Sequence, residues 1–215
     1  MQIVAVVSQK GGVGKTTLAI HLATLFSRAG KNTVLLDLDP QASASSWSDR
    51  RKEDIPVVIS THAKRLLSEL DRVAQNDGEI VLIDTAPHSD PIALEAMRHA
   101  NLVLIPTRPS ILDIDAIVST LQLAKLAEKD VLVVLNACPA RGQDPIEATT
   151  AITDLEVEVS HSSLTQRIGF ARSLLYGKTV LEMEPTGKAS IELQALGHHI
   201  NQKLQLLGEH NYVTE

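Results

Sequence analysis

Continuous runs of apolar residues alternate along the chain with longer segments in which apolar positions recur every three or four residues. The strongest runs predict buried strands at residues 3–7, 33–39, 80–84, 102–106 and 131–135. Runs that are apolar throughout, rather than at every second position, are typical of strands covered on both faces of a parallel sheet. Weaker strands are expected at 56–59 and, on the sheet edge, at 157–159.

The segments between these runs predict helices. Apolar positions follow a helical period at 18–31, 62–74, 90–99, 114–127, 144–154, 165–175 and 186–207, and a shorter helix is expected at 42–47. Strands that alternate with helices predict an α/β fold, with a mostly parallel, twisted sheet and helices on both of its faces. We expect a single domain over residues 1–207 and a disordered tail at 208–215.

The composition narrows the class of protein. Of the 215 residues, 44% are hydrophobic but only 2% are aromatic, so the core must be aliphatic. No apolar run reaches the roughly 18 residues that a membrane-spanning helix needs, and the first residues predict a strand and a loop rather than a signal peptide. The single cysteine, Cys138, excludes an internal disulfide. We therefore expect a cytoplasmic protein that does not bind a membrane.

The first strand leads into a glycine-rich loop, Lys10-Gly11-Gly12-Val13-Gly14-Lys15-Thr16-Thr17, and a helix follows it. Strand, glycine turn and helix are the context in which such a string binds phosphate. The glycines let backbone N–H groups close round an anion, and the helix N-terminus adds partial positive charge. We expect residues 11–17 to hold a nucleotide, with Lys15 at its β- and γ-phosphates and the Thr16 hydroxyl on Mg²⁺.

Carboxylates stand at the ends of two other predicted strands, where functional residues of parallel sheets collect. Asp84 ends one strand, a position from which a carboxylate can hold Mg²⁺, usually through water. Asp37 and Asp39 end another, and because they are two residues apart their side chains point the same way. An Asp-x-Asp pair by itself would more simply be two solvated turn residues, so its interpretation depends on the loop upstream.

Together these motifs resemble the ParA/MinD family of ATPases. The loop has Gln9 where the common G-x-x-x-x-G-K-[ST] loop has its first Gly, and a second lysine, Lys10, follows. That form is similar to the family's deviant Walker A motif. The segment Asp37-Leu38-Asp39-Pro40-Gln41 resembles its Walker A′ motif, D-x-D-P-Q.

The resemblance implies a Mg²⁺-dependent ATP hydrolase with Lys10, Lys15 and Asp39 as catalytic residues. Asp39 would orient or polarise the attacking water, and Asp37 would support the Mg²⁺ shell. Lys10 would reach the phosphates of a partner subunit in an ATP-dependent sandwich homodimer, where its charge acts much as an arginine finger does. An exposed loop lysine is the alternative for Lys10.

Further assignments rest on shorter matches. Asn136 follows the last strong strand, and its amide can pair with the edge of adenine. Pro185 lies where relatives complete the base pocket. The segment Pro106-Thr107-Arg108-Pro109-Ser110 resembles the family's P-x-x-P-S segment at the dimer face, although Arg108 could equally be a solvated surface residue.

Basic residues gather in one stretch of this acidic chain, whose net charge is −6. No acidic residue lies between Glu158 and Glu182, and Arg167, Arg172 and Lys178 fall in that gap. Small ParA proteins bind DNA phosphates without sequence preference through such residues. A solvated helix face is the alternative for each residue singly. No helix-turn-helix segment precedes the loop, so we expect a ParB-like partner to recognise specific DNA and to stimulate hydrolysis.

Three other functions compete with a ParA-type ATPase that partitions plasmid or chromosomal DNA on the nucleoid. A MinD-like ATPase would position protein cargo or act at a membrane, but Lys203 is the only basic residue at the C-terminal apolar face. A nitrogenase-type iron–sulfur reductase needs two cysteines per subunit, and only Cys138 is present. For a ligase such as a dethiobiotin synthetase, nothing in the sequence suggests a second substrate pocket.

Overall fold

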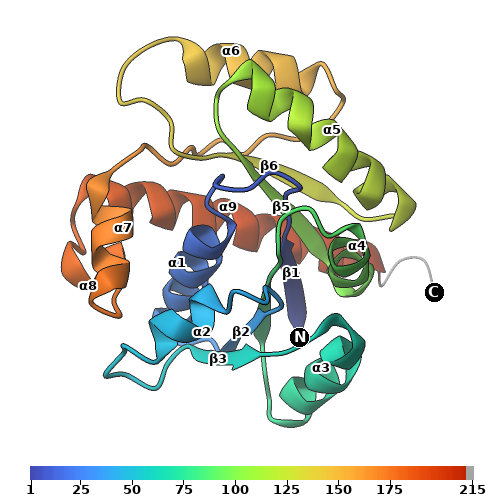
Figure 1. Ribbon diagram of the computed structural model, residues 1–215, viewed down its shortest axis with the longest axis vertical. Coiled ribbons are helices and arrows are strands. Elements are labelled where there is room, and N and C mark those ends of the chain that lie inside the picture. Colours follow the sequence, from blue (N-terminus) through green and yellow to red (C-terminus); the bar gives the residue numbers. More distant parts are fainter. Residues whose placement is uncertain (212–215) are drawn as a thin grey trace.

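A single sheet of six parallel strands, in the order β3-β2-β4-β1-β5-β6, runs through the centre of the molecule (Figure 1). The computed structural model describes residues 1–211, with the backbone alone for 208–211. The strands are β1 (Gln2–Val6), β2 (Thr33–Asp37), β3 (Val57–Ser60), β4 (Ile80–Asp84), β5 (Leu102–Thr107) and β6 (Val131–Leu135). The predicted α/β fold with a mostly parallel sheet is confirmed.

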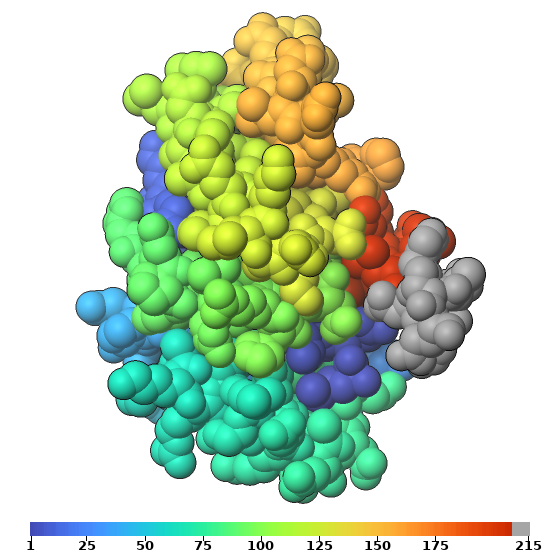
Figure 2. All heavy atoms as spheres, turned by 90° about the vertical axis from the view of Figure 1, so that its right-hand side faces the viewer, coloured from blue at the N-terminus to red at the C-terminus, as the bar shows by residue number. Residues whose placement is uncertain are grey.

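Helices cover both faces of the sheet, as predicted. One face carries α1 (Lys15–Arg28), α2 (Ser43–Ser48), α7 (Ile168–Leu175), α8 (Val180–Met183) and α9 (Lys188–Asn211). The other carries the 3₁₀ turn η1 (Ala63–Arg65), α3 (Leu66–Gln75), α4 (Asp90–His99), α5 (Ile111–Leu126) and α6 (Asp144–Thr153). The second face looks toward the viewer in Figure 2. Among the described residues, no helix has both the length and the apolar character to cross a membrane.

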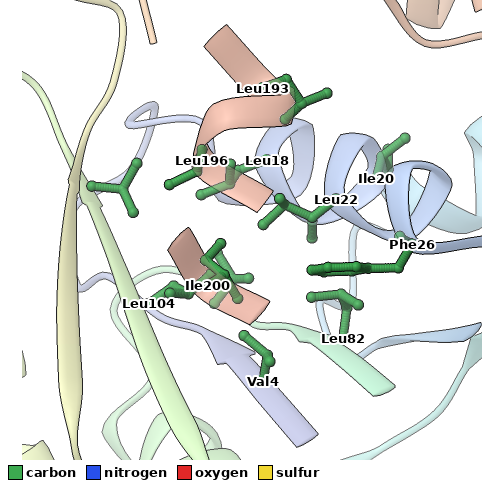
Figure 3. Close-up of a cluster of buried hydrophobic side chains, with 14 of the residues drawn as sticks. Val4, Leu18, Ile20, Leu22, Phe26, Leu82, Leu104, Leu193, Leu196 and Ile200 are labelled. Carbon is green, nitrogen blue, oxygen red and sulfur yellow. The ribbon is translucent and has the colours of Figure 1, made fainter. Parts of the chain in front are cut away.

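The core consists of two aliphatic layers because side chains alternate along each buried strand. Val4 belongs to the layer under α1 and α9, whereas its neighbour Ala5 belongs to the layer under α3 to α6. Figure 3 shows α1 and α9 meeting over the strands in the first layer. A β-carbon on Gly197 would lie 2.1 Å from Leu25 Cδ2, so a larger residue where α9 crosses α1 would force the Leu25 side chain to move.

The predicted and observed elements differ mainly in the last third of the chain. Residues 157–159 form no strand, because only a single bridge joins Val133 to Val159. Helix α7 begins at Ile168 rather than at 165, since Thr165 makes a bridge with Cys138. The short helix α8 was not predicted. Helix α9 continues to Asn211, into the predicted tail, and residues 212–215 lie outside the described part of the chain.

The strand register places the predicted functional residues at one edge of the sheet. Asp84 at the end of β4 pairs with Asp37 on one side and with Val6 on the other. Three strands therefore end in one row, and the loop that follows β1 begins beside both carboxylates. The site is built at this carboxyl-end edge, as expected for an open α/β sheet.

Candidate functional site

The glycine-rich loop connects β1 to α1 and has the backbone geometry of an anion-binding turn. Gly12 and Gly14 have φ angles of 76° and 92°, which L side chains adopt only with strain. Gly14 is also the N-cap of α1, and no side chain caps that helix or places a negative charge in its first turn. The N–H groups at the start of α1 are thus available to a bound anion.

Lys15, the first residue of α1, points back over this loop. Its side-chain amine donates a hydrogen bond to the Lys10 carbonyl at 3.3 Å, and the residue is only 6% exposed. Burial lowers the pKa of Lys15, while the charges of Asp84 and Asp39 act in the opposite direction. The loop lysine therefore contacts the loop backbone and lies within electrostatic reach of Asp84, a predicted metal-binding residue, and of Asp39, a predicted catalytic residue.

Asp84 is the most unusual polar group of the site. The residue is completely buried, and neither of its carboxylate oxygens has a hydrogen-bond partner among the described residues. Burial raises its pKa to about 7, against the effects of the Thr16 side chain and of Lys15. A native protein rarely leaves such a carboxylate unpartnered, and carboxylate and hydroxyl oxygens are the ligands that Mg²⁺ prefers. The Asp84 and Thr16 side chains fit that ion.

Asp37 was predicted to support the Mg²⁺ shell, and its carboxylate already has several hydrogen-bond donors. One oxygen accepts hydrogen bonds from the backbone N–H of Ala44 and of Ser45, both at 3.1 Å, and from the Ser45 hydroxyl at 3.3 Å. The other accepts from the backbone N–H of Asp39 at 3.2 Å. Asp37 therefore satisfies the N-terminus of α2 and fixes the turn that carries Asp39.

Asp39 lies in that turn, two residues beyond the end of β2. It is half-buried, and one carboxylate oxygen accepts a hydrogen bond from the backbone N–H of Gln41 at 2.9 Å. The charge of Asp39 is near enough to Lys15 to act on the pKa of that lysine. Asp39, which was predicted to orient the attacking water, is thus held by its own turn and remains partly exposed to solvent.

Lys10 forms an ion pair within its own chain. Its amine lies 2.6 Å from a carboxylate oxygen of Asp113, in the first turn of α5. The other Asp113 oxygen accepts a hydrogen bond from the hydroxyl of Ser110, the N-cap of that helix, at 2.6 Å. Sequence reasoning missed Asp113, although Ser110 and Asp113 have the Ser-x-x-Asp spacing of a helix N-terminus.

A cavity of about 430 Å³ opens beside the loop and is large enough for a small ligand. Its lining includes loop residues Gly12 to Gly14, Arg108 and Asn136, together with Arg167 and Phe170 near the start of α7. Pro185, predicted to complete a base pocket, is exposed and does not line this cavity. A hollow of about 510 Å³ lies at the opposite edge of the sheet, remote from every predicted site residue.

Asn136, predicted to contact adenine, contacts the loop itself. Its side-chain amide donates a hydrogen bond to the Val13 carbonyl at 2.7 Å, and Arg108 donates one to the Gly12 carbonyl. Both residues also line the cavity.

The three predicted DNA-binding residues do not share one environment. Arg167 forms a 2.5 Å ion pair with Glu192 of α9, which lies outside the sequence gap that suggested a basic patch. Arg172 and Lys178 are exposed, on α7 and on the turn that follows it. The structure thus leaves two of the three cations free of that acidic partner.

Comparison with known proteins gives consistent results. Residues 4–180 match the family of CobQ/CobB/MinD/ParA nucleotide-binding domains. The chain is 29% identical to the maintenance of carboxysome distribution protein A of Gloeobacter kilaueensis, over 90% of this chain and 89% of that protein. It is 27% identical to protein ParA of Rhizobium radiobacter, over 86% and 87% respectively.

A solved structure extends the likeness to the whole fold. The septum site-determining protein MinD of Pyrococcus horikoshii OT3, solved as a complex with Mg-ADP, superposes with a TM-score of 0.79. The match covers 96% of this chain and 98% of that one at 17% identity.

Proposed function

This chain belongs to the CobQ/CobB/MinD/ParA nucleotide-binding family, and on that premise we propose that it is a Mg²⁺-dependent ATPase of the partition type. ATP binding drives a homodimer that binds non-specific DNA, and partner-stimulated hydrolysis releases it. The proposal is supported mainly by the buried carboxylate of Asp84, whose oxygens have no hydrogen-bond partner among the described residues. It is also supported by the N-terminus of α1, which no described side chain caps. A metal–phosphate complex would satisfy both groups at once.

The side chains divide the work of hydrolysis. Thr16 and Asp84 would hold Mg²⁺, which when bound neutralises negative charge on the β- and γ-phosphates. Lys15 leaves the Lys10 carbonyl to pair with the same phosphates. Asp39 orients the attacking water. We assign Asp37 to the support of that turn, because four donors already occupy its carboxylate.

Lys10 is the residue from which we infer a homodimer. One loop lysine suffices for phosphates bound in cis, and Lys10 is the second. Its amine is partly exposed and rests on Asp113, so it can move to the phosphates of a facing subunit. There its charge would stabilise the transition state.

The cargo separates two versions of this function. The resemblance of the sequence motifs to partition ATPases favours DNA, with a ParB-like partner that recognises specific sites. Likeness to the maintenance of carboxysome distribution protein A favours a protein body as the cargo. In both versions the chain needs ATP-dependent binding to non-specific DNA.

Phosphate release tests the enzymatic part. Wild-type protein with Mg-ATP should release phosphate slowly, and faster with DNA and a partner, whereas Lys15→Ala should release none above background. Turnover by Lys15→Ala at the wild-type rate would refute the assignment of the loop. Equal affinity for DNA in ATP and in ADP would refute the proposal that ATP binding controls DNA binding.

A further inference from the structure

We propose that Arg108 and Asn136 are positioning residues that hold the phosphate loop in its binding conformation through two of its carbonyls. The inference rests on the proposed function, since it assumes that the loop binds nucleotide phosphates. Arg108 donates a hydrogen bond to the Gly12 carbonyl, and Asn136 donates one to the Val13 carbonyl at 2.7 Å. Two consecutive carbonyls of the loop are thus held by side chains from outside it.

The geometry of the peptide bond explains what this achieves. In a trans peptide the carbonyl and the following N–H point in opposite directions. With the Gly12 and Val13 carbonyls turned toward Arg108 and Asn136, the N–H groups of Val13 and Gly14 face the other way. Those N–H groups then converge on the concave side of the loop, as in an anion-binding nest.

The two side chains come from neighbouring strands, which makes the support rigid. Arg108 follows β5 and Asn136 follows β6, and the backbone N–H of Asn136 donates to the Thr107 carbonyl at 2.7 Å. The glycines fit the same arrangement. A β-carbon at Gly14 would lie 2.4 Å from the Asn136 amide nitrogen, so glycine at this position and asparagine at 136 are matched.

This role differs from the two roles that the sequence suggested. A residue that reads adenine affects only ligands with that base, and a residue at a dimer face affects only the dimer. A residue that holds the loop affects every ligand with a polyphosphate, including inorganic tripolyphosphate, in the monomer. The distinction can be measured because tripolyphosphate has no base.

The experiment is equilibrium binding of Mg-ATP and of Mg-tripolyphosphate to Asn136→Ala and Arg108→Ala, with Lys10→Ala as the background to keep the protein monomeric. Each variant should raise the dissociation constants of both ligands by about the same factor, on the order of tenfold. This is the usual effect of losing one hydrogen bond to a positioned group. Arg108→Lys keeps a donor and should recover part of the loss. Arg98→Ala, which removes an exposed arginine paired with Glu95, should bind both ligands normally.

Several results would overturn the inference. One is weaker binding of Mg-ATP with unchanged binding of Mg-tripolyphosphate, which would indicate that Asn136 contacts adenine instead. A second is wild-type affinity for both ligands in the alanine variants, and a third is a background protein that binds Mg-ATP but not Mg-tripolyphosphate. A background protein that binds neither refutes the proposed function itself. Asn136→Leu, which keeps a side chain of similar size, loses the donor and adds no charge, replaces Asn136→Ala if that variant unfolds without ligand.

Discussion

At the scale of single residues, the ion pair between Lys10 and Asp113 holds the Lys10 side chain within its own subunit. The Lys10 side chain is 38% exposed, and that of Asp113 is 8% exposed. Burial would raise the pKa of Asp113, but hydrogen bonds from Lys10 and Ser110 hold it below its ordinary value. Lys10 must leave this carboxylate to reach another subunit, and a partly exposed pair contributes at most about 1 kcal/mol.

Asp113→Asn should therefore favour the dimer. The amide keeps an acceptor for Ser110 but loses the charge that retains Lys10. We expect the ATP-dependent dimer to form at a protein concentration about two- to fivefold lower, which corresponds to less than about 1 kcal/mol. Sedimentation across a concentration series measures this. A weaker dimer would mean that Asp113 acts in the assembled state.

Asp84→Asn should raise the melting temperature of the protein without ligand and abolish the further rise that Mg-ATP causes. At pH 8 most of the native carboxylate is ionised, because burial raises its pKa to about 7, and no cation is paired with it at ion-pair distance among the described residues. Removing that charge should raise the melting temperature in EDTA, since a buried unpaired charge is destabilising. The rise in melting temperature on adding Mg-ATP should disappear. If Asp84→Asn is less stable in EDTA and still responds to Mg-ATP, Asp84 is not a metal-binding group.

At the scale of elements, α2 is fastened at both ends. Asp37 holds its N-terminus, and Arg51 just beyond its C-terminus forms a buried ion pair with Glu182 of α8, whose side chains are 3% and 6% exposed. Arg51 also donates to the Gly177 carbonyl at 2.9 Å and lies 4.5 Å from the Trp47 ring centre. The turn that carries Asp39 is thereby joined to the α7–α8 segment.

Arg51→Ala should lower the free energy of unfolding by about 3–5 kcal/mol, because it leaves Glu182 buried without its partner. Burial would raise the pKa of Glu182, but hydrogen bonds from Arg51 and Thr179 hold it below its ordinary value of 4.5. The stability from this pair is therefore present above pH 4.5 and is lost as pH falls through the lower folded pKa.

Urea unfolding at neutral and at acidic pH measures both effects. Arg98→Ala is the matched control, because Arg98 is exposed and its loss should change stability by less than about 1 kcal/mol. If Arg51→Ala changes the free energy of unfolding by less than about 1 kcal/mol and keeps the wild-type pH dependence, the Arg51–Glu182 ion pair contributes little to stability.

The elements also show what the sequence could predict. The parallel strands and most helices follow from apolar runs and helical periods, because burial on both faces leaves a strong pattern. Helix α8 has four residues, too few for any period to be visible. The contact between Arg167 and Glu192 spans 25 residues, so a gap in acidic residues along the chain was no guide to charge in space. The opposed carboxylates of β2 and β4 could be predicted, whereas the Arg108 and Asn136 contacts with the loop required coordinates.

At the scale of the whole molecule, a chain with net charge −6 must concentrate positive charge to bind DNA. Arg172 and Lys178 are exposed near one another along the chain, whereas Arg167 is paired with Glu192 and lines the cavity beside the loop. We therefore expect the DNA contact to depend on the first two residues, doubled by dimerisation.

Arg172→Ala should weaken binding to non-specific DNA and lower the salt dependence. Each dimer would lose two phosphate contacts, so the slope of log affinity against log salt should fall by about 1.8. Lys178→Ala should act alike, while ATP-dependent dimerisation stays normal in both. An unchanged slope in both variants would place the DNA contact elsewhere on the surface.

The proposed nucleotide-controlled dimer can be measured by light scattering during size exclusion. With ADP the wild-type protein should have the monomer mass of 23.3 kDa, and with Mg-ATP it should have twice that mass. Asp39→Ala, which we expect to bind Mg-ATP without hydrolysing it, should remain dimeric in Mg-ATP, and Lys10→Ala should remain largely monomeric. A monomer mass for both wild type and Asp39→Ala in saturating Mg-ATP would contradict the account.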